Sequence, residues 1–105
     1  MNLIHHNRKA LSATEIVTQL SQLNGEQALG WRIIDGALEK TFSFKNYYET
    51  IAFVNAMAFV AHAENHHPDL TVSYGKCVAR FSTHALDGIS VSDFFCASKA
   101  DALLL

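Results

Sequence analysis

Pro68 is the only proline in the chain, and it limits how far the longest apolar segment can remain helical. Residues 46–63 are apolar on more than one side, and Asn46 is a suitable N-cap for a helix over this range. Proline disfavours the helical conformation of the residue before it, so this helix must end ahead of Pro68. His66 and His67 therefore occupy the corner at which the chain leaves the helix.

This helix carries two apolar stripes, which predicts that it is either central in the fold or shared between its own sheet and a partner. The stripes consist of Ile51, Val54, Ala58 and Ala61, and of Phe53, Met57 and Val60. The chain has 105 residues, of which 50% are hydrophobic, so we expect a second copy to cover part of the apolar surface.

A hairpin pattern lies on each side of the apolar helix. Before it, "LGWRIIDGALEKTFSF" (29–44) places Asp35 and Gly36 between alternating segments, which favours a tight type I′ turn. After it, "DLTVSY" (69–74) and "CVARFST" (77–83) flank Gly75 and Lys76. Both patterns predict pairs of antiparallel strands.

Two further helices complete the pattern. Ser12 with Glu15 predicts a capping box at the start of the first helix, and Ser90 with Asp93 begins the last. The sequence thus predicts one α+β domain over residues 1–105, with a loose N-terminus over 1–10. Its expected order is α-β-β-α-β-β-α, with a four-stranded antiparallel sheet and three helices on one face.

Charge and cysteine usage exclude several classes of protein. The formal net charge is −2, which supports neither a basic face for nucleic acid nor a polybasic membrane anchor. No apolar stretch is long enough to span a bilayer and no secretory signal is visible, so we expect a cytoplasmic protein. Cys77 and Cys96 are expected to be reduced and buried, and His5 and His6 to be a solvated terminal pair.

Three histidines are predicted to lie at the same end of the sheet. If the last two strands pair, residues just before Leu70 lie close to those just after Phe81, which brings His66, His67 and His84 to one edge. Histidine has an unperturbed pKa of about 6.5 and can give or take a proton near neutral pH. The pattern therefore indicates a proton-transfer site.

A metal site is the competing interpretation. His62 and His66 have the i, i+4 spacing that places two ligands on one helix face, and His67 or His84 could add a third. However, "HAENH" (62–66) matches neither HExxH nor HxxEH. We therefore expect no metal, and an ordinary surface histidine at position 62.

Four segments together resemble the pterin-4a-carbinolamine dehydratase family, which includes the dimerisation cofactor of a hepatocyte nuclear factor. They are "HHPD" (66–69), Tyr74 six residues after the proline, "STH" (82–84) and "DGISVSD" (87–93). The resemblance covers nearly the whole chain after about residue 8.

The resemblance implies a function as well as the fold derived above. Family members remove water from 4a-hydroxytetrahydrobiopterin to give quinonoid dihydropterin, without a metal or other cofactor. They form homodimers that often pair into homotetramers through helices. Their usual setting is pterin recycling beside an aromatic amino acid hydroxylase, and some bacterial relatives are linked to molybdopterin metabolism instead.

The resemblance also assigns roles to individual residues. It implies that His66 and His84 form the acid/base pair and that His67 mainly positions the substrate. The substrate-binding residues it implies are Trp31, Asn65, Pro68 and Asp87. Trp31 could equally be part of the core, and Asp87 could orient a histidine or make only the turn.

One position departs from many relatives, which have aspartate where this chain has Asn65. A carboxylate there could raise the pKa of a neighbouring histidine, and Asn65 cannot. The sequence also leaves two alternative functions open. One is a dimeric protein-binding cofactor, which the widely apolar helix over residues 46–63 favours, and the other is a non-catalytic pterin-binding protein on the same fold.

Overall fold

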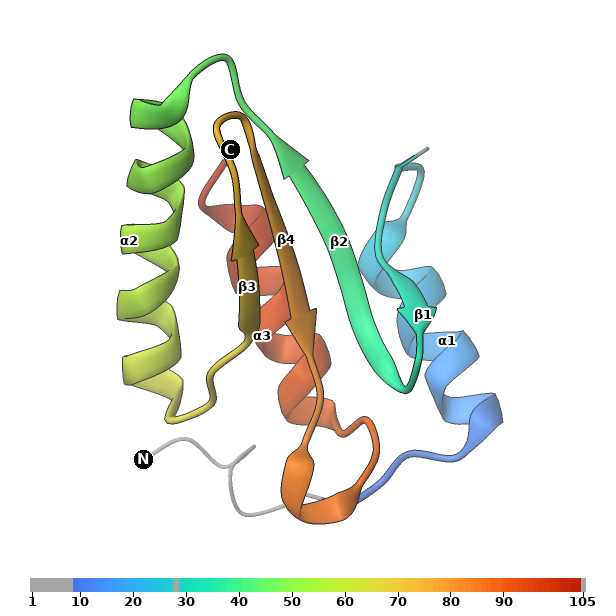
Figure 1. Cartoon of the computed structure of the whole chain (residues 1–105). Helices are drawn as coiled ribbons and strands as arrows, with labels where there is room; N and C mark the ends of the chain where they lie inside the picture. Colours follow the sequence, from blue (N-terminus) through green and yellow to red (C-terminus); the bar gives the residue numbers. More distant parts are fainter. Residues whose placement is uncertain (1–8, 28, 105) are drawn as a thin grey trace.

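The computed structural model describes residues 9–27 and 29–104, and its elements follow the predicted order. The predicted α+β fold class is confirmed (Figure 1). His5 and His6, with most of the expected loose N-terminus, lie outside the described residues. The elements are α1 (Ala13–Asn24), β1 (Arg32–Ile34), β2 (Ala37–Ser43), α2 (Tyr47–Glu64), β3 (Asp69–Val72), β4 (Lys76–Phe81), the short 3-10 helix η2 (His84–Leu86) and α3 (Val91–Ala102).

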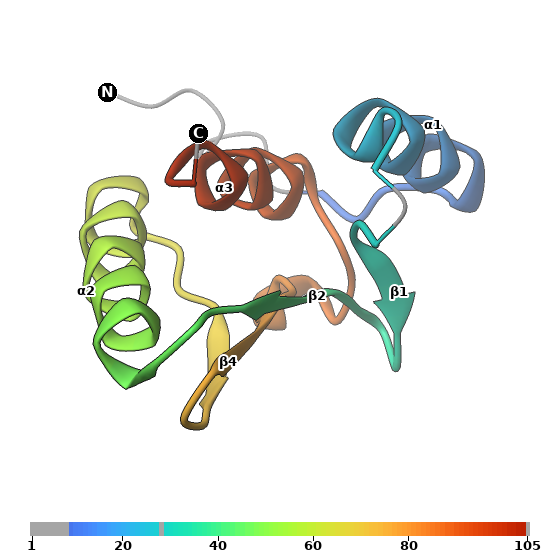
Figure 2. The ribbon, with the colours of Figure 1, turned by 90° about the horizontal axis from the view of Figure 1, so that it is seen from above.

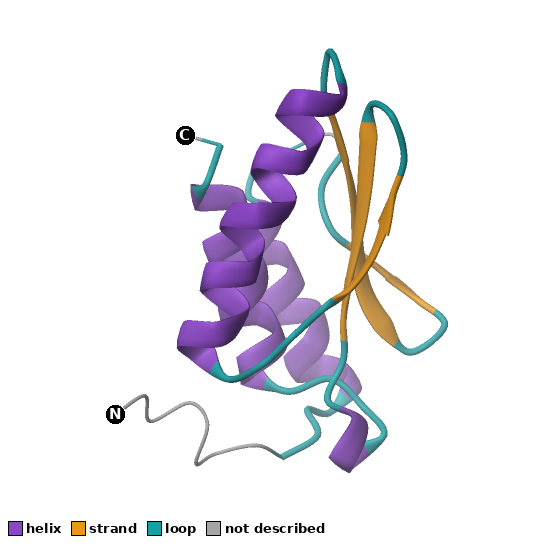
Figure 3. Cartoon of the chain, turned by 60° about the vertical axis from the view of Figure 1, so that its left-hand side comes forward, coloured by secondary structure: helices purple, strands orange, loops and turns teal. Residues whose placement is uncertain are grey.

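The four strands form one antiparallel sheet in the order β1-β2-β4-β3. The two hairpins therefore join through β2 and β4, where Leu38 pairs with Phe81 and Phe42 with Cys77. All three helices lie on one face of this sheet (Figures 2 and 3).

Local sequence signals account for both hairpin turns. Asp35 and Gly36 have φ angles of 48° and 76°, so both lie in the left-handed region that a type I′ turn requires, as predicted. Gly75 is needed for a different reason. A Cβ at this position would lie 2.9 Å from the carbonyl oxygen of Phe44, whose N–H also donates to the Gly75 carbonyl.

The predicted caps are present at the helix starts. The Ser12 N–H donates to Glu15 Oε1 at 2.9 Å, and the Glu15 N–H donates back to Ser12 Oγ at 3.2 Å. Asn46 Oδ1 accepts from the Glu49 N–H at 2.9 Å at the start of α2. These bonds satisfy N–H groups that have no partner within the helix.

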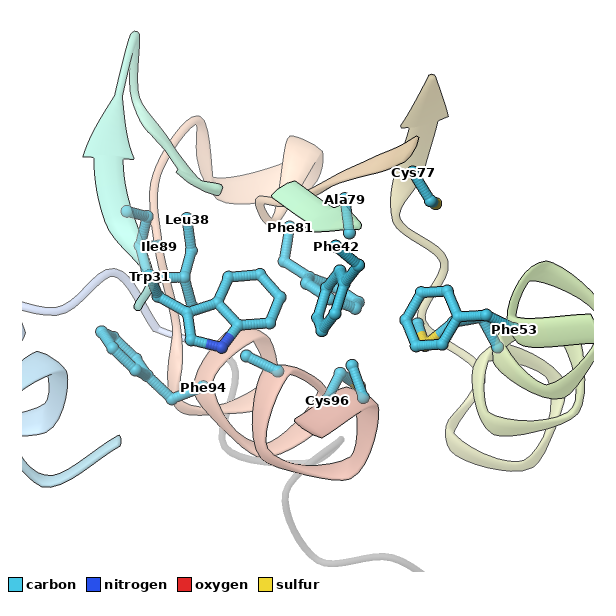
Figure 4. Close-up of a cluster of buried hydrophobic side chains, with 13 residues drawn as sticks. Trp31, Leu38, Phe42, Phe53, Cys77, Ala79, Phe81, Ile89, Phe94 and Cys96 are labelled. Atoms are coloured by element: carbon cyan, nitrogen blue, oxygen red, sulfur yellow. The ribbon is translucent and has the colours of Figure 1, made fainter. Parts of the chain in front are cut away.

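The core lies between the sheet and α3, with α2 closing one side (Figure 4). Fully burying an aromatic or large aliphatic side chain contributes roughly 1.5–3 kcal/mol, so these side chains dominate the stability of the fold. The cluster contains Trp31, Leu38, Phe42, Phe53, Met57, Cys77, Ala79, Phe81, Ile89, Phe94, Cys96, Ala97 and Ala100.

The apolar helix α2 is not central in the fold. It lies at one side of the sheet (Figure 1), and it buries Thr50, Phe53 and Met57. Tyr48 and Phe59 are 89% and 79% exposed on its outer surface. Of the two sequence alternatives, the structure therefore favours a helix shared with a partner, and the partner itself stays a prediction. Among the described residues, no helix is long and apolar enough to cross a membrane.

The end of β4 differs from the sequence expectation. The sequence pattern predicts that the last strand continues to Thr83 and reaches His84, but β4 ends at Phe81 and His84 begins η2. The backbone turns because the Thr83 N–H donates to the Gly88 carbonyl at 2.8 Å, which closes a loop over residues 83–88. Asp87 has a φ of 48° inside this loop, a conformation that aspartate adopts more readily than most residues.

Candidate active site

The corner between α2 and β3 sends two adjacent histidines in different directions. The Asn65 N–H donates to the His62 carbonyl at 3.2 Å and the His66 N–H to the Ala61 carbonyl at 3.1 Å, the pattern of a Schellman-type helix end. Asn65 has a φ of 50°, which asparagine tolerates well. After this reversal, His66 is buried and His67 is exposed.

His66 points into the protein and is 6% exposed. Its Nε2 lies 2.5 Å from Oδ1 of Asp93, and its ring stacks over Phe81 with the ring centroids 6.3 Å apart. Because a carboxylate accepts but does not donate, Nε2 is the ring nitrogen that carries the hydrogen. Proton transfer through the other ring nitrogen, Nδ1, stays a prediction.

Asp93 is fully buried and is held on both carboxylate oxygens. Its Oδ2 accepts from the Ser90 N–H and from Thr83 Oγ1, both at 2.8 Å. Thr83 and Ser90 also join each other through their hydroxyls at 2.7 Å. Both oxygens of this buried side chain therefore have hydrogen-bond partners, as the burial of a polar group requires.

Sequence reasoning missed this role of Asp93. It treated Asp93 only as the acidic partner in the capping box of α3, and that bond is present. The second oxygen of the Asp93 carboxylate is available for a contact outside the capping box. The sequence signal for such a contact is that the capping box follows the "STH" segment within a few residues.

His67 lies at a cavity between α2 and β3. The cavity has a volume of about 330 Å³ and a mainly apolar lining. Its lining residues are Met57, Ala58, Ala61, His62, Asn65, His67, Pro68 and Leu70. Asn65 and Pro68, both expected to bind substrate, thus share a cavity with His67. His62, expected to be an ordinary surface histidine, lines it too.

His84 lies at a second, larger cavity of about 560 Å³. This cavity extends from the loop after β4 to the turn between β1 and β2, and Asp87 also lines it. Its other polar residues include Asp35, Asp69, Arg80 and Ser82. The Asp87 N–H donates to the His84 carbonyl at 3.1 Å, so Asp87 makes the turn and also lines the cavity.

The expected juxtaposition at one end of the sheet is present, but each ring has different surroundings. Asp69 pairs with Arg80, so the α2–β3 corner and the loop after β4 lie at the same end (Figure 1). His66 is buried, whereas His67 and His84 line separate cavities. Convergence of all three rings on one substrate stays a prediction.

Trp31 lies elsewhere. It is 1% exposed, and its ring centroid is 5.8 Å from those of Phe42 and Phe81. Its Nε1 donates to Asp101 Oδ2 at 3.1 Å. Trp31 lines a third cavity, of about 460 Å³, and is absent from the lining of the two histidine cavities. Its position is that of a core residue, and substrate contact stays a prediction.

The histidines at this end of the sheet are the potential metal ligands that the sequence singles out. Across residues 9–27 and 29–104, no three histidine, cysteine, aspartate or glutamate side chains form a group that could hold a metal ion. His62 and His66 keep their i, i+4 spacing, but the His66 ring is bonded to Asp93.

Known proteins match this chain over most of its length. A family model described as pterin 4 alpha carbinolamine dehydratase matches residues 9–103. A relative from Paracidovorax citrulli, named as a pterin-4-alpha-carbinolamine dehydratase, is 56% identical over 102 residues, or 94% of this chain and 84% of its own length. A relative of the same name from Nitrosomonas eutropha is 48% identical over 93 residues, covering 89% of this chain and 76% of its own.

Two solved structures share the fold. A transcriptional coactivator/pterin dehydratase from Brucella melitensis has a TM-score of 0.82 at 26% identity and covers 90% of this chain and 98% of its own. A pterin dehydratase-like protein described as a RuBisCO assembly factor has a TM-score of 0.62 at 25% identity, covering 70% of this chain and 88% of its own. Since the family model and these relatives match nearly the whole described chain, the protein belongs to the pterin-4-alpha-carbinolamine dehydratase family.

Proposed function

We propose that this protein is a hydro-lyase that dehydrates 4a-hydroxytetrahydrobiopterin, or a closely related pterin, to the quinonoid dihydropterin. Family membership over residues 9–103 supports the reaction class. The observation that carries the proposal for this chain is the buried His66–Asp93 pair, with His67 and His84 at cavities in the same region.

The reaction needs two proton transfers and no redox partner. The bond between C4a and the hydroxyl oxygen breaks, and that oxygen takes a proton and leaves as water. N5 loses its proton, and its electrons form the double bond to C4a. General acid/base catalysis by histidine can serve both transfers near neutral pH, so the proposal requires neither a metal nor another cofactor.

His66 and His84 are proposed as the acid/base pair, with His67 positioning the substrate. His84 is exposed and can contact a bound pterin directly. The His66 side chain is only 6% exposed, and Asp93 binds its Nε2. We therefore propose that His66 transfers a proton through Nδ1. A carboxylate that holds one ring nitrogen in this way fixes the orientation and tautomer of the imidazole.

The remaining proposed binding residues differ in how well the structure supports them. Asn65 and Pro68 line the cavity of His67, and Asp87 lines that of His84, so all three can reach a ligand. Trp31 has the weakest support, because its ring packs in the core and its Nε1 is bonded to Asp101.

The test follows the dehydration of freshly generated 4a-carbinolamine by absorbance. Wild-type protein is expected to accelerate the reaction above its uncatalysed rate. His84→Ala and His67→Ala are each expected to lower the rate, by roughly 10²-fold if the residue transfers a proton. Wild-type rates in both variants would remove these histidines from the mechanism.

A second candidate function is that of a dimeric or tetrameric partner for another protein. The exposed aromatic residues Tyr48 and Phe59 on α2 favour it, since exposed apolar patches mark interaction sites. Names of structural relatives also point to roles beyond catalysis. Native mass spectrometry would test for the oligomer, and a strictly monomeric protein would exclude assembly through α2. Both functions can coexist in one chain.

A further inference from the structure

We infer that His62 is a substrate-positioning residue, which holds the polar edge of the pterin in the same cavity as His67. The inference rests on the proposed dehydratase function. It assigns a role in that function to His62, which the sequence pattern predicts to be an ordinary surface histidine. Its basis is that His62 and His67 line one cavity of about 330 Å³.

The shape of the helix end brings these two residues together. His62 belongs to the last turn of α2, and its carbonyl accepts the Asn65 N–H at 3.2 Å. The left-handed conformation of Asn65 then reverses the chain, so that residue 67 returns towards the final helical turn. Pro68 restricts the backbone after this reversal. The cavity is thus bounded by segments of restricted backbone conformation.

The lining of the cavity fits a flat heterocycle with one polar edge. Met57, Ala61 and Leu70 supply apolar surface, whereas His62, Asn65 and His67 supply the polar groups. Small-molecule sites commonly have this composition and a volume of about 300–1,000 Å³. A pterin presents apolar ring faces and an edge with N–H donors and a carbonyl acceptor, and therefore matches both parts of the lining.

An imidazole can satisfy either kind of group on that edge. A neutral ring donates through one nitrogen and accepts through the other, so His62 can donate to the pterin carbonyl or accept from an N–H. The two proton transfers of dehydration are assigned to His66 and His84, so His62 is not required for the chemical step. A contact made equally in the bound substrate and the transition state changes KM and leaves kcat unchanged.

The experiment compares His62→Ala, His62→Gln and wild type. His62→Ala is expected to raise KM for the carbinolamine about fivefold to tenfold, because the loss of one hydrogen bond weakens binding by roughly this factor. Its kcat should stay within about twofold of wild type. His62→Gln can donate and accept, so it should recover most of the loss. Asn55→Ala is the matched control, because Asn55 is exposed on the same helix and lies outside the cavity lining.

Binding of 7,8-dihydrobiopterin, a stable pterin without the 4a-hydroxyl, provides a readout independent of turnover. His62→Ala should raise its Kd by the same factor as KM, and Asn55→Ala should not change it. Circular dichroism at 222 nm checks that each variant is folded. His62→Gln serves as the test variant if the alanine variant does not fold.

The outcomes separate the inference from the proposed function. Wild-type turnover with unchanged KM and Kd in both His62 variants would overturn the role of His62 and leave the dehydratase intact. Pterin binding that depends on His62 without wild-type turnover would overturn the dehydratase and retain the site. A fall in kcat with unchanged KM would show that His62 acts in the chemical step and would overturn the positioning role.

Discussion

Nε2 of His66 and Oδ1 of Asp93 are 2.5 Å apart, in a part of the protein where the histidine is 6% exposed and the aspartate is fully buried. The two residues are 27 positions apart in the chain, one just beyond the end of α2 and the other in the first turn of α3. The contact therefore joins the histidine corner to the last helix, and it holds the ring in one orientation.

Removing the Asp93 carboxylate should destabilise the protein strongly. Asp93→Ala leaves His66, Thr83 and the Ser90 N–H without their shared partner, and breaking such a buried pair costs about 3–5 kcal/mol. Urea unfolding at neutral pH measures the loss. Asp93→Asn retains the shape and one acceptor oxygen, so its loss should be smaller. A loss below about 1 kcal/mol for alanine would show that the pair does not hold the corner.

The outer surface of α2 should control assembly. Phe59→Ser and Tyr48→Ser each remove an aromatic side chain that is 79% or 89% exposed, so the fold should keep its thermal midpoint while any oligomer formed through α2 dissociates. Native mass spectrometry measures the oligomeric state of the wild-type protein and of each variant. Val17→Ser is the control, since Val17 is 67% exposed on α1 and should leave assembly unchanged. An oligomer that survives both α2 substitutions uses another surface.

The capping box of α1 should make the free energy of unfolding depend on pH in the acidic range. Hydrogen bonds from the Ser12 backbone N–H, then from the Ser12 hydroxyl, lower the pKa of Glu15 below its ordinary 4.5. The carboxylate therefore stabilises the fold fully above that ordinary value, and the contribution is lost as pH falls through the lowered pKa.

The Glu15→Gln variant tests whether the Glu15 carboxylate stabilises the fold more at neutral pH than in acid. The variant should have a lower thermal midpoint than wild type at about pH 7, and the difference should close as the pH falls through the lowered pKa of Glu15. Ser12→Ala should cost about 1 kcal/mol at neutral pH, because it removes the hydroxyl that accepts from the Glu15 N–H. A difference between wild type and Glu15→Gln that grows in acid would contradict the assignment.

The Cys77 thiol should not react with alkylating reagents in the folded protein. Its side chain is fully buried, and burial raises the pKa of the thiol above its ordinary 9.0, so little reactive thiolate forms. Cys96, 1% exposed, should be protected by burial alone. Iodoacetamide at about pH 8 should label neither cysteine in native protein and both in denaturant, as read by intact mass. Rapid labelling of Cys77 in native protein would show that the β2–β4 region opens.

The local features of the fold could be predicted from the sequence because each depends on neighbouring residues. Asp35 and Gly36 adopt the left-handed angles of their turn, Ser12 and Glu15 cap each other, and Pro68 lies beyond the end of α2. These interactions span only a few positions, so the residue types themselves predicted the helices and strands and their order.

The contacts that shape the candidate site could not be predicted, because they join distant segments. Burial of His66 depends on Asp93, the core position of Trp31 on Asp101, and the shared cavity of His62 and His67 on how β3 returns beside α2. Which side of a histidine faces solvent is decided by packing between elements, and periodicity within one element carries no information on it. Interactions between neighbouring residues therefore fix the element order and the end of the sheet that holds the histidines. Packing between distant elements selects which ring is buried and which rings line a cavity.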